Sequence, residues 1–397
     1  NNTYIVTVRA TDNNGKTSTQ TITVTISNVD EIAQKLGELG SSLRSDLRNH
    51  AFSSLSAMLA FNEHLLEADE SCGGGTGGNE TISGHIRANE QQTAAGARFA
   101  QHLSTCESST RLLIDGGFNI NRVDGNWISR GLASARIKQR IGHRTILSAA
   151  LIGTTASDDL GAFEDSQIAD KSLQINLYAR TSLSDTLRFA AFAGWGHAWY
   201  SFDLTENGFA LNGKINGKRH LYGAALSGDV TLAGVTVTTD AIFSRAIERL
   251  GSAKLDASVG GETRDNMRFN IGKVDITRLS IPVHIPVVFD HPNDGREATQ
   301  LDFRQGILCQ DTRQDSSAVE CGFQFGAKLR ISPSQNSVMR ADALVESVNG
   351  YLLNQFMIGF ERRLLNDKPL ALGIDLGRTK SQHQIDDRIM IRFGIKN

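Results

Sequence analysis

The sequence predicts an all-β fold, a transmembrane antiparallel up-and-down β-barrel of 12–14 strands with an N-terminal α-helix in its lumen. Three observations lead to this prediction. From Thr110 onward, apolar and polar residues alternate with period two, in segments as long as the roughly 9–11 residues of a tilted membrane strand, or longer. The polar faces of these segments hold Arg, Lys and Gly, which suit a wet or helix-filled lumen. The connections between segments alternate between short and long, as in barrels with tight turns at one end.

The alternation is clearest over residues 172–183. Leu173, Ile175 and Leu177 fall on one face, and the residues between them are mostly polar. Because successive side chains of a strand point to opposite faces, the polar set should face the lumen. The same reading of the other segments gives the expected lumen-facing residues: Arg136, Lys138, Arg140, Gln174, Asn176, Tyr178, Arg180, Arg188, Lys328, Arg330 and Arg392.

About 14 such segments can be counted, and 12 is also allowed if some pair outside the membrane. They start near Thr110, Trp127, Thr145, Ser172, Leu187, Arg219, Val235, Met267, Leu301, Val319, Val338, Leu352, Leu370 and Arg388. The long connections are expected at residues 155–170, 204–218, 251–265 and 311–318.

Residues 31–67 predict one long α-helix, roughly 54 Å at 1.5 Å per residue, preceded by Asp30 as N-cap. An apolar stripe includes Leu36, Leu39, Leu43 and Leu47, and the charged residues include Glu38, Arg44, Asp46 and Arg48. These charges exclude a lipid-exposed span, so we expect the helix inside a narrow polar tunnel. One hypothesis is that a mostly basic lumen holds the acidic helix residues. The alternative is a solvated lumen whose charges pair with one another.

Residues 68–108 predict a Gly-rich loop and a second, polar helix over residues 85–103, either a plug or a periplasmic insert. The sequence does not separate these two. The cysteines predict two disulfides in an oxidising compartment, joining Cys72 with Cys106 and Cys309 with Cys321.

Composition narrows the function classes. The chain of 397 residues has a net charge of −2, which gives no electrostatic case for a nucleic-acid partner. The barrel-region histidines lie on different segments, with no nucleophile or carboxylate at a recurring offset, so we expect no catalytic residues and no enzyme activity.

Residues 1–30 alternate around the turn TDNNGK and resemble the last hairpin of a cadherin-like repeat. The resemblance implies calcium as a cofactor of that repeat, at the matching positions Asp12, Asn14, Asn28 and Asp30. The alternative is that Asp12 and Asn14 form the turn and Asp30 caps the helix. Because the chain opens in mid-pattern, we expect it to continue a longer protein.

The order of hairpin (1–30), helix (31–67), insert (68–108) and alternating strands (109–397) is similar to the C-terminal part of monomeric autotransporters, the type V secretion class. The final strand, with Ile389, Ile391, Phe393 and Ile395 in alternation, resembles the family's assembly strand, although Asn397 replaces the terminal aromatic residue. The resemblance implies a monomer in outer-membrane lipid, assembled by the barrel-assembly machinery. It also implies that the barrel secretes and anchors its own passenger, here cadherin-like and adhesive, with the N-terminal part at the cell surface. Because residues 31–67 contain no Asn-Asn pair, we expect an uncleaved passenger.

Two other readings remain open. One is a porin-like solute channel plugged by its N-terminal helix. A channel of this kind does not need a repeat domain fused before the helix. The other is a soluble β-sandwich adhesin domain, because sandwiches also alternate.

Overall fold

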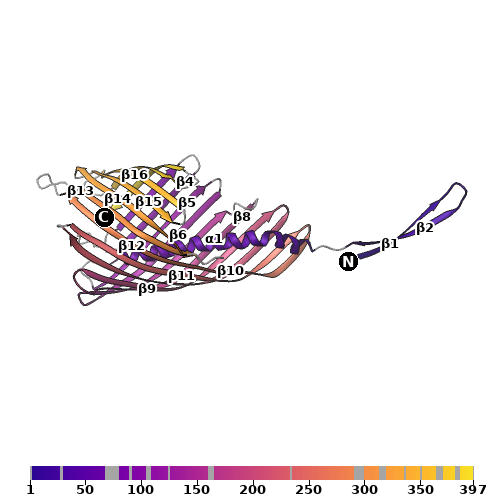
Figure 1. The fold of residues 1–397 in the computed structure, drawn as a ribbon, viewed down its shortest axis with the longest axis horizontal. Helices are drawn as coiled ribbons and strands as arrows, with labels where there is room; N and C mark the ends of the chain where they lie inside the picture. The colour runs from indigo at the N-terminus through magenta and orange to yellow at the C-terminus, as the bar shows by residue number, and fades with distance from the viewer. Residues whose placement is uncertain are drawn as a thin grey trace.

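The computed structural model describes residues 2–26, 30–67, 80–88, 92–103, 109–123, 126–159, 165–232, 235–289, 299–312, 319–334, 337–348, 351–363, 370–380 and 385–396. These residues form one closed barrel, one long helix in its lumen and a separate two-stranded hairpin (Figure 1). The predicted fold class is confirmed.

The barrel contains 16 strands within the described residues, β3 to β18, each paired with its sequence neighbours. All pairs are antiparallel, and β18 pairs with β3 to close the barrel. The first half comprises β3 (Glu80–Ala88), β4 (Gln92–His102), β5 (Thr110–Val123), β6 (Asn126–Ile141), β7 (Thr145–Asp159), β8 (Asp165–Ser182), β9 (Leu187–Glu206) and β10 (Phe209–Leu232). The second half comprises β11 (Val235–Val259), β12 (Glu262–Phe289), β13 (Thr299–Thr312), β14 (Val319–Ser334), β15 (Ser337–Val348), β16 (Tyr351–Arg363), β17 (Leu370–Lys380) and β18 (Ile385–Lys396).

The expected count of 12–14 strands is too low, because the segment assigned to a second helix supplies two more. The expected segments from Thr110 onward correspond one to one with β5–β18. Residues 80–88 and 92–102 are strands, not part of a helix. Their Ala, Gln, Glu and Arg content favours a helix, but the pairing of β3 with β18 and of β4 with β5 overrides that weak propensity. The Gly-rich loop at 68–79 and both Cys72 and Cys106 lie outside the described residues.

Strands β9 to β12 are the longest, at 20 to 28 residues. The long loops expected at 204–218 and 251–265 are instead strand with tight turns. Asn207-Gly208 has φ angles of 48° and 77°, and Gly260-Gly261 has 57° and 89°. Positive φ at both central residues is the geometry of two-residue hairpin turns that match strand twist. The four strands therefore extend past the rest of the barrel end (Figure 1).

The barrel has its apolar face outward and its polar face inward. On β8, Leu173, Ile175 and Leu177 are 48%, 56% and 49% exposed, whereas Gln174 and Asn176 between them are buried. A soluble sandwich would bury the apolar set, so this distribution argues against that reading. Cys309 and Cys321 form the predicted disulfide between β13 and β14.

The helix α1 (Glu31–Glu67) begins at the tips of the long strands. Asp30 accepts the Ala33 amide at 3.0 Å as the predicted N-cap and also pairs with Arg264 of β12. Within the described part of the chain, no helix is apolar enough over sufficient length to cross a membrane. The hairpin of β1 (Asn2–Thr11) and β2 (Thr17–Ile26) lies beyond the barrel end at which α1 starts (Figure 1).

Candidate functional site

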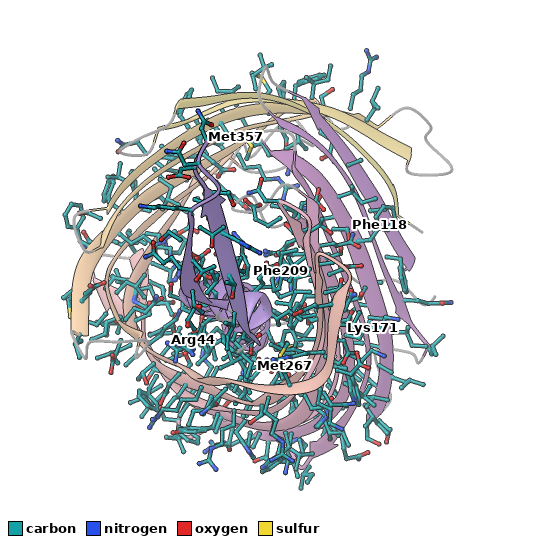
Figure 2. All side chains as sticks on the ribbon, turned by 90° about the vertical axis from the view of Figure 1, so that its right-hand side faces the viewer. Arg44, Phe118, Lys171, Phe209, Met267 and Met357 are labelled. Carbon is teal, nitrogen blue, oxygen red and sulfur yellow. A yellow bond between two sulfur atoms is a disulfide. The ribbon has the colours of Figure 1, made fainter. Side chains whose placement is uncertain are left out.

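The site that the fold builds is the contact between α1 and the inner barrel wall. The first half of α1 packs against the inner faces of the long strands. We call this apolar surface the gutter. Ile32, Leu43 and Leu47 of α1 are at most 1% exposed. They belong to one cluster with Phe209, Leu211, Ile215, Leu255, Phe269 and Ile271 of β10–β12. Figure 2 looks along the barrel and shows the labelled Arg44, Phe209 and Met267 gathered around α1.

Two arginines of α1 fix the position of the helix along the barrel axis. The Arg44 guanidinium lies 5.0 Å from the Phe269 ring centroid and donates to the Asn270 carbonyl at 3.1 Å. Arg48 donates to the next carbonyl, of Ile271, at 2.8 Å. These carbonyls precede Gly272, whose φ of 99° is a conformation that favours glycine. Two cationic side chains of α1 therefore hold the helix by hydrogen bonds to backbone carbonyls of β12.

Halfway along α1, His50 lies between two carboxylates of the barrel. Its Nδ1 is 2.6 Å from Asp158 Oδ2, and its Nε2 is 2.8 Å from Asp170 Oδ1. A carboxylate only accepts hydrogen bonds, so both ring nitrogens must donate and the ring is an imidazolium. No ring nitrogen remains to serve as a catalytic base. The residue is an ion-pair bridge from the helix to β7 and β8.

The network continues through Arg219 of β10, which is fully buried. It donates to Glu248 at 2.8 Å, to the Tyr200 hydroxyl at 2.7 Å and to Ser54 of α1 at 3.1 Å, and it lies 3.6 Å from Asp170. The Tyr200 hydroxyl in turn donates to Glu248 at 2.6 Å. Buried charges of this kind are stable only when every member has partners, so the helix and four strands depend on one another here.

The last described turns of α1 make a second polar contact. Asn62 is fully buried, and its Oδ1 accepts from Asn176 and, at 2.6 Å, from the Tyr178 hydroxyl. Glu63 accepts from Ser244 and lies 3.7 Å from Arg278 of β12. Polar contacts therefore continue to this end of the helix.

The Asn62→Leu variant should lower the free energy of unfolding by about 1–3 kcal/mol, because two buried donors lose their acceptor without water to replace it. Equilibrium unfolding of the barrel in urea measures this. Asn49→Leu, on an exposed part of the same helix, is the matched control and should change stability by less than about 0.5 kcal/mol. Equal losses in the two variants would refute a specific role for Asn62.

The structure places the predicted helix residues in two groups. Leu43 and Leu47 are buried, Leu36 and Leu39 are half-buried, and Arg44 and Arg48 contact the wall. Glu38 is exposed and bonds to Gln34 and Lys35 within the helix. Asp46 is half-buried, and its Oδ2 has no hydrogen-bond partner among the described residues.

The hypothesis that a basic lumen holds Glu38 and Asp46 is wrong for these two residues. The polarity is mainly the reverse, with helix cations meeting barrel carboxylates and carbonyls. Among the described acidic side chains of α1, Glu63 is the one that forms an ion pair with a barrel arginine, Arg278.

The predicted lumen-facing residues lie on the inner side of the alternation wherever their side chains are described, but their burial differs. Arg136, Gln174 and Asn176 are buried. Tyr178, Arg180, Arg188 and Lys138 are half-buried, and Arg140, Lys328 and Arg330 are exposed. The side chain of Arg392 lies outside the described residues, as do those of Ile389, Ile391, Phe393 and Ile395 of β18.

Sequence reasoning missed His50, Asp158, Asp170, Arg219 and Glu248. Asp158 and Asp170 fell within a stretch expected to be a loop, so their inward direction was not assigned. The alternation could have predicted the direction of Asp170. It lies two positions before Ser172 and four before Gln174, so it falls on the same polar face of the strand. His50 gave no signal, because its position on α1 matters only once the barrel is present.

The predicted calcium positions serve local structure. Asp12 Oδ1 accepts from the Asn14 and Lys16 amides at 2.9 and 2.8 Å, as a turn former does. Asp30 is the helix cap, and Asn28 lies outside the described residues. Within the described ranges, no group of three or more His, Cys, Asp or Glu side chains is arranged so that it could hold a metal ion.

The helix does not fill the lumen evenly. Its described contacts fall mainly on β8 to β12. Toward β5–β7 a cavity of about 470 Å³ remains between Ser54, Met58 and Phe61 of α1 and the wall, which includes Asp115, Arg130 and Thr154.

Known structures share this fold. The chain is 10% identical to CdiB from Acinetobacter baumannii with a TM-score of 0.50, covering 100% of this chain and 66% of that one. It is 10% identical to the translocator domain of autotransporter NalP from Neisseria meningitidis (TM-score 0.39, 90% and 96% covered). It is 9% identical to BauA, the ferric preacinetobactin receptor from Acinetobacter baumannii (TM-score 0.42, 77% and 54% covered). No family model matches the sequence, and no curated protein matches it. At 10% identity, the likeness to CdiB shows a shared β-barrel fold and nothing finer.

Proposed function

We propose that this chain is an outer-membrane translocator that carries its own N-terminal segment to the cell surface and anchors it there. One observation carries the proposal: the helix in the lumen belongs to the barrel's own chain and leads to a hairpin outside the barrel (Figure 1). A segment that has passed through a pore and stopped would leave this arrangement.

The grip on α1 supports the anchoring role. Moving the helix by one turn, about 5.4 Å, would take His50 away from both carboxylates and Arg48 away from its carbonyl. Charges would then face the apolar gutter without partners, which is costly. Retention therefore follows from the side chains that contact the wall, and we propose that the passenger stays attached and uncleaved.

The finer features of this proposal come from the family resemblance. The passenger is cadherin-like and adhesive and takes calcium in its complete repeats. The barrel is a monomer, and the barrel-assembly machinery recognises its final strand. That strand is β18, which pairs antiparallel with β17 and β3.

Surface exposure of the hairpin tests the proposal. A protease-cleavable epitope inserted at Asn13-Asn14, in the β1–β2 turn, should be cut in intact cells. The same epitope at Gly142-His143, the β6–β7 turn at the opposite barrel end, should be cut only after the outer membrane is permeabilised. Protection of the first site in intact cells would refute surface display.

The cavity beside α1 favours a second candidate, a solute channel. Barrels of 16 strands are wide enough to hold an aqueous path, and the helix covers one side of this lumen. A channel function predicts steady conductance of the unmodified barrel with α1 in place. A translocator at rest predicts conductance only when α1 is displaced.

A further inference from the structure

Two rows of cations cross the outer wall of the long strands. In the first row, Lys218 of β10 lies opposite Arg249 of β11, which lies opposite Lys273 of β12. In the second row, Lys214 lies opposite Lys254, which lies opposite Arg268. All six are exposed, and along their strands they alternate with buried or half-buried residues of the inner face. We call these six residues the basic rows.

The first row marks a border on the outer surface. Through the strand register it continues to His197 of β9 and Leu173 of β8. On one side of it most outward side chains are apolar or aromatic, including Ile175, Trp195, Tyr222 and Phe243. His220 and the ion pair of Arg245 with Asp275 lie among them. On the other side most are polar, including Asn212, Ser201 and Asp203, and the exposed Trp199 lies among them. Trp and Tyr at the end of an apolar band mark the level of lipid headgroups, so the first row lies at that level.

Directly opposed like charges destabilise a sheet unless a counter-charge is present. Within the described residues, Lys273 has a carboxylate partner, Asp275 at 3.4 Å. None of the other five lies within 4.0 Å of a described carboxylate, so the described part of the chain leaves five neighbouring cations without an ion pair.

A recess of about 440 Å³ lies at the second row. Lys214 and Lys254 line it, together with Ser201, Asn212, Asp203 and Asp256. Cations, hydroxyl and amide groups in one recess suit a phosphorylated sugar, whose hydroxyls bond to the amides and carboxylates while its phosphate meets the lysines.

We propose that the basic rows bind the phosphorylated sugar headgroup of the glycolipid in the outer leaflet. The position at the edge of the apolar band selects a lipid over a soluble anion, and the recess selects a phosphosugar over a simple phosphodiester headgroup. Such a contact would hold the barrel at fixed depth on the side where α1 enters. The inference rests on the outer-membrane placement but not on translocation.

The test uses the full chain refolded in neutral detergent, with bisphosphorylated lipid A as the probe and binding measured by titration. Lys218→Gln/Arg249→Gln should weaken binding roughly 25-fold and Lys214→Gln/Lys254→Gln/Arg268→Gln roughly 100-fold, because each cation at an anionic membrane surface contributes a factor of about five. Arg9→Gln/Lys16→Gln/Arg144→Gln removes three charges away from the rows and should bind like the unmodified chain. Heat-modifiable migration confirms that every variant is folded.

Dephosphorylated lipid A and phosphatidylglycerol, each titrated in the same detergent, identify the ligand. Loss of binding to both supports the phosphorylated glycolipid. Equal binding to phosphatidylglycerol would overturn it in favour of any anionic lipid, and equal weakening by the control variant would overturn the site. Epitope cleavage on intact cells is a separate measurement. A failure of surface display would therefore not change what the lipid A titration shows.

Discussion

Replacing Arg219 by methionine should lower the free energy of unfolding by roughly 3–5 kcal/mol, one of the two largest effects we expect in this chain. Arg219 is fully buried and is the one cation that reaches both Glu248 and Asp170 in the described network. Methionine fills a similar volume but leaves Glu248 charged, buried and without an ion pair. Urea unfolding in lipid vesicles, followed by heat-modifiable migration, measures the loss.

Two further variants separate the charge effect from a general effect of arginine removal. Arg219→Met/Glu248→Met should be more stable than Arg219→Met alone, because the orphaned carboxylate is gone. Arg188→Met removes a half-exposed pair with Asp229 at 2.9 Å and should cost at most about 1 kcal/mol. If Arg219→Met costs no more than Arg188→Met, the buried network does not stabilise the barrel.

The sequence predicts most of this fold because strand alternation is a local property. The outward set of β8, with Leu173, Ile175 and Leu177, could be assigned from residue spacing alone. The expected starts of β5, β7, β9 and β11 coincide with the observed ones. The helix is equally local, with its stripe and its cap at Asp30.

What could not be predicted depends on distant partners. Residues 80–102 have helical composition and become strands because β18 and β5 need neighbours to close the barrel. The extension of β9–β12 depends on two tight turns in Gly-rich stretches that equally suit loops. The bridge joins His50 to Asp158 and to Asp170, each of which lies more than a hundred positions later in the sequence. No spacing rule relates His50 to either aspartate.

The His50→Asp variant should release α1 from the lumen, and the folded barrel should then conduct ions in planar bilayers at a level well above that of the unmodified chain. The substitution replaces a cation that lies 2.6 Å from Asp158 and 2.8 Å from Asp170 with a third carboxylate, so attraction becomes repulsion. Loss of a buried ion-pair partner alone costs roughly 3–5 kcal/mol. Together with the new repulsion, we expect this loss to outweigh the remaining contacts of α1, which include those of Arg44, Asn62 and Glu63.

The control is Asn49→Asp, which adds the same charge one residue away on an exposed part of the helix. It should leave the conductance unchanged. Glu38→Lys, which reverses an exposed charge bonded only within the helix among the described contacts, should also leave it unchanged. High conductance in His50→Asp alone would show that the His50 bridge holds the plug in place. Equal conductance in all three variants and the unmodified chain would mean that α1 stays in place without the bridge. Steady high conductance before any substitution would favour the solute-channel function instead, because the path beside α1 toward β5–β7 would then be open at rest.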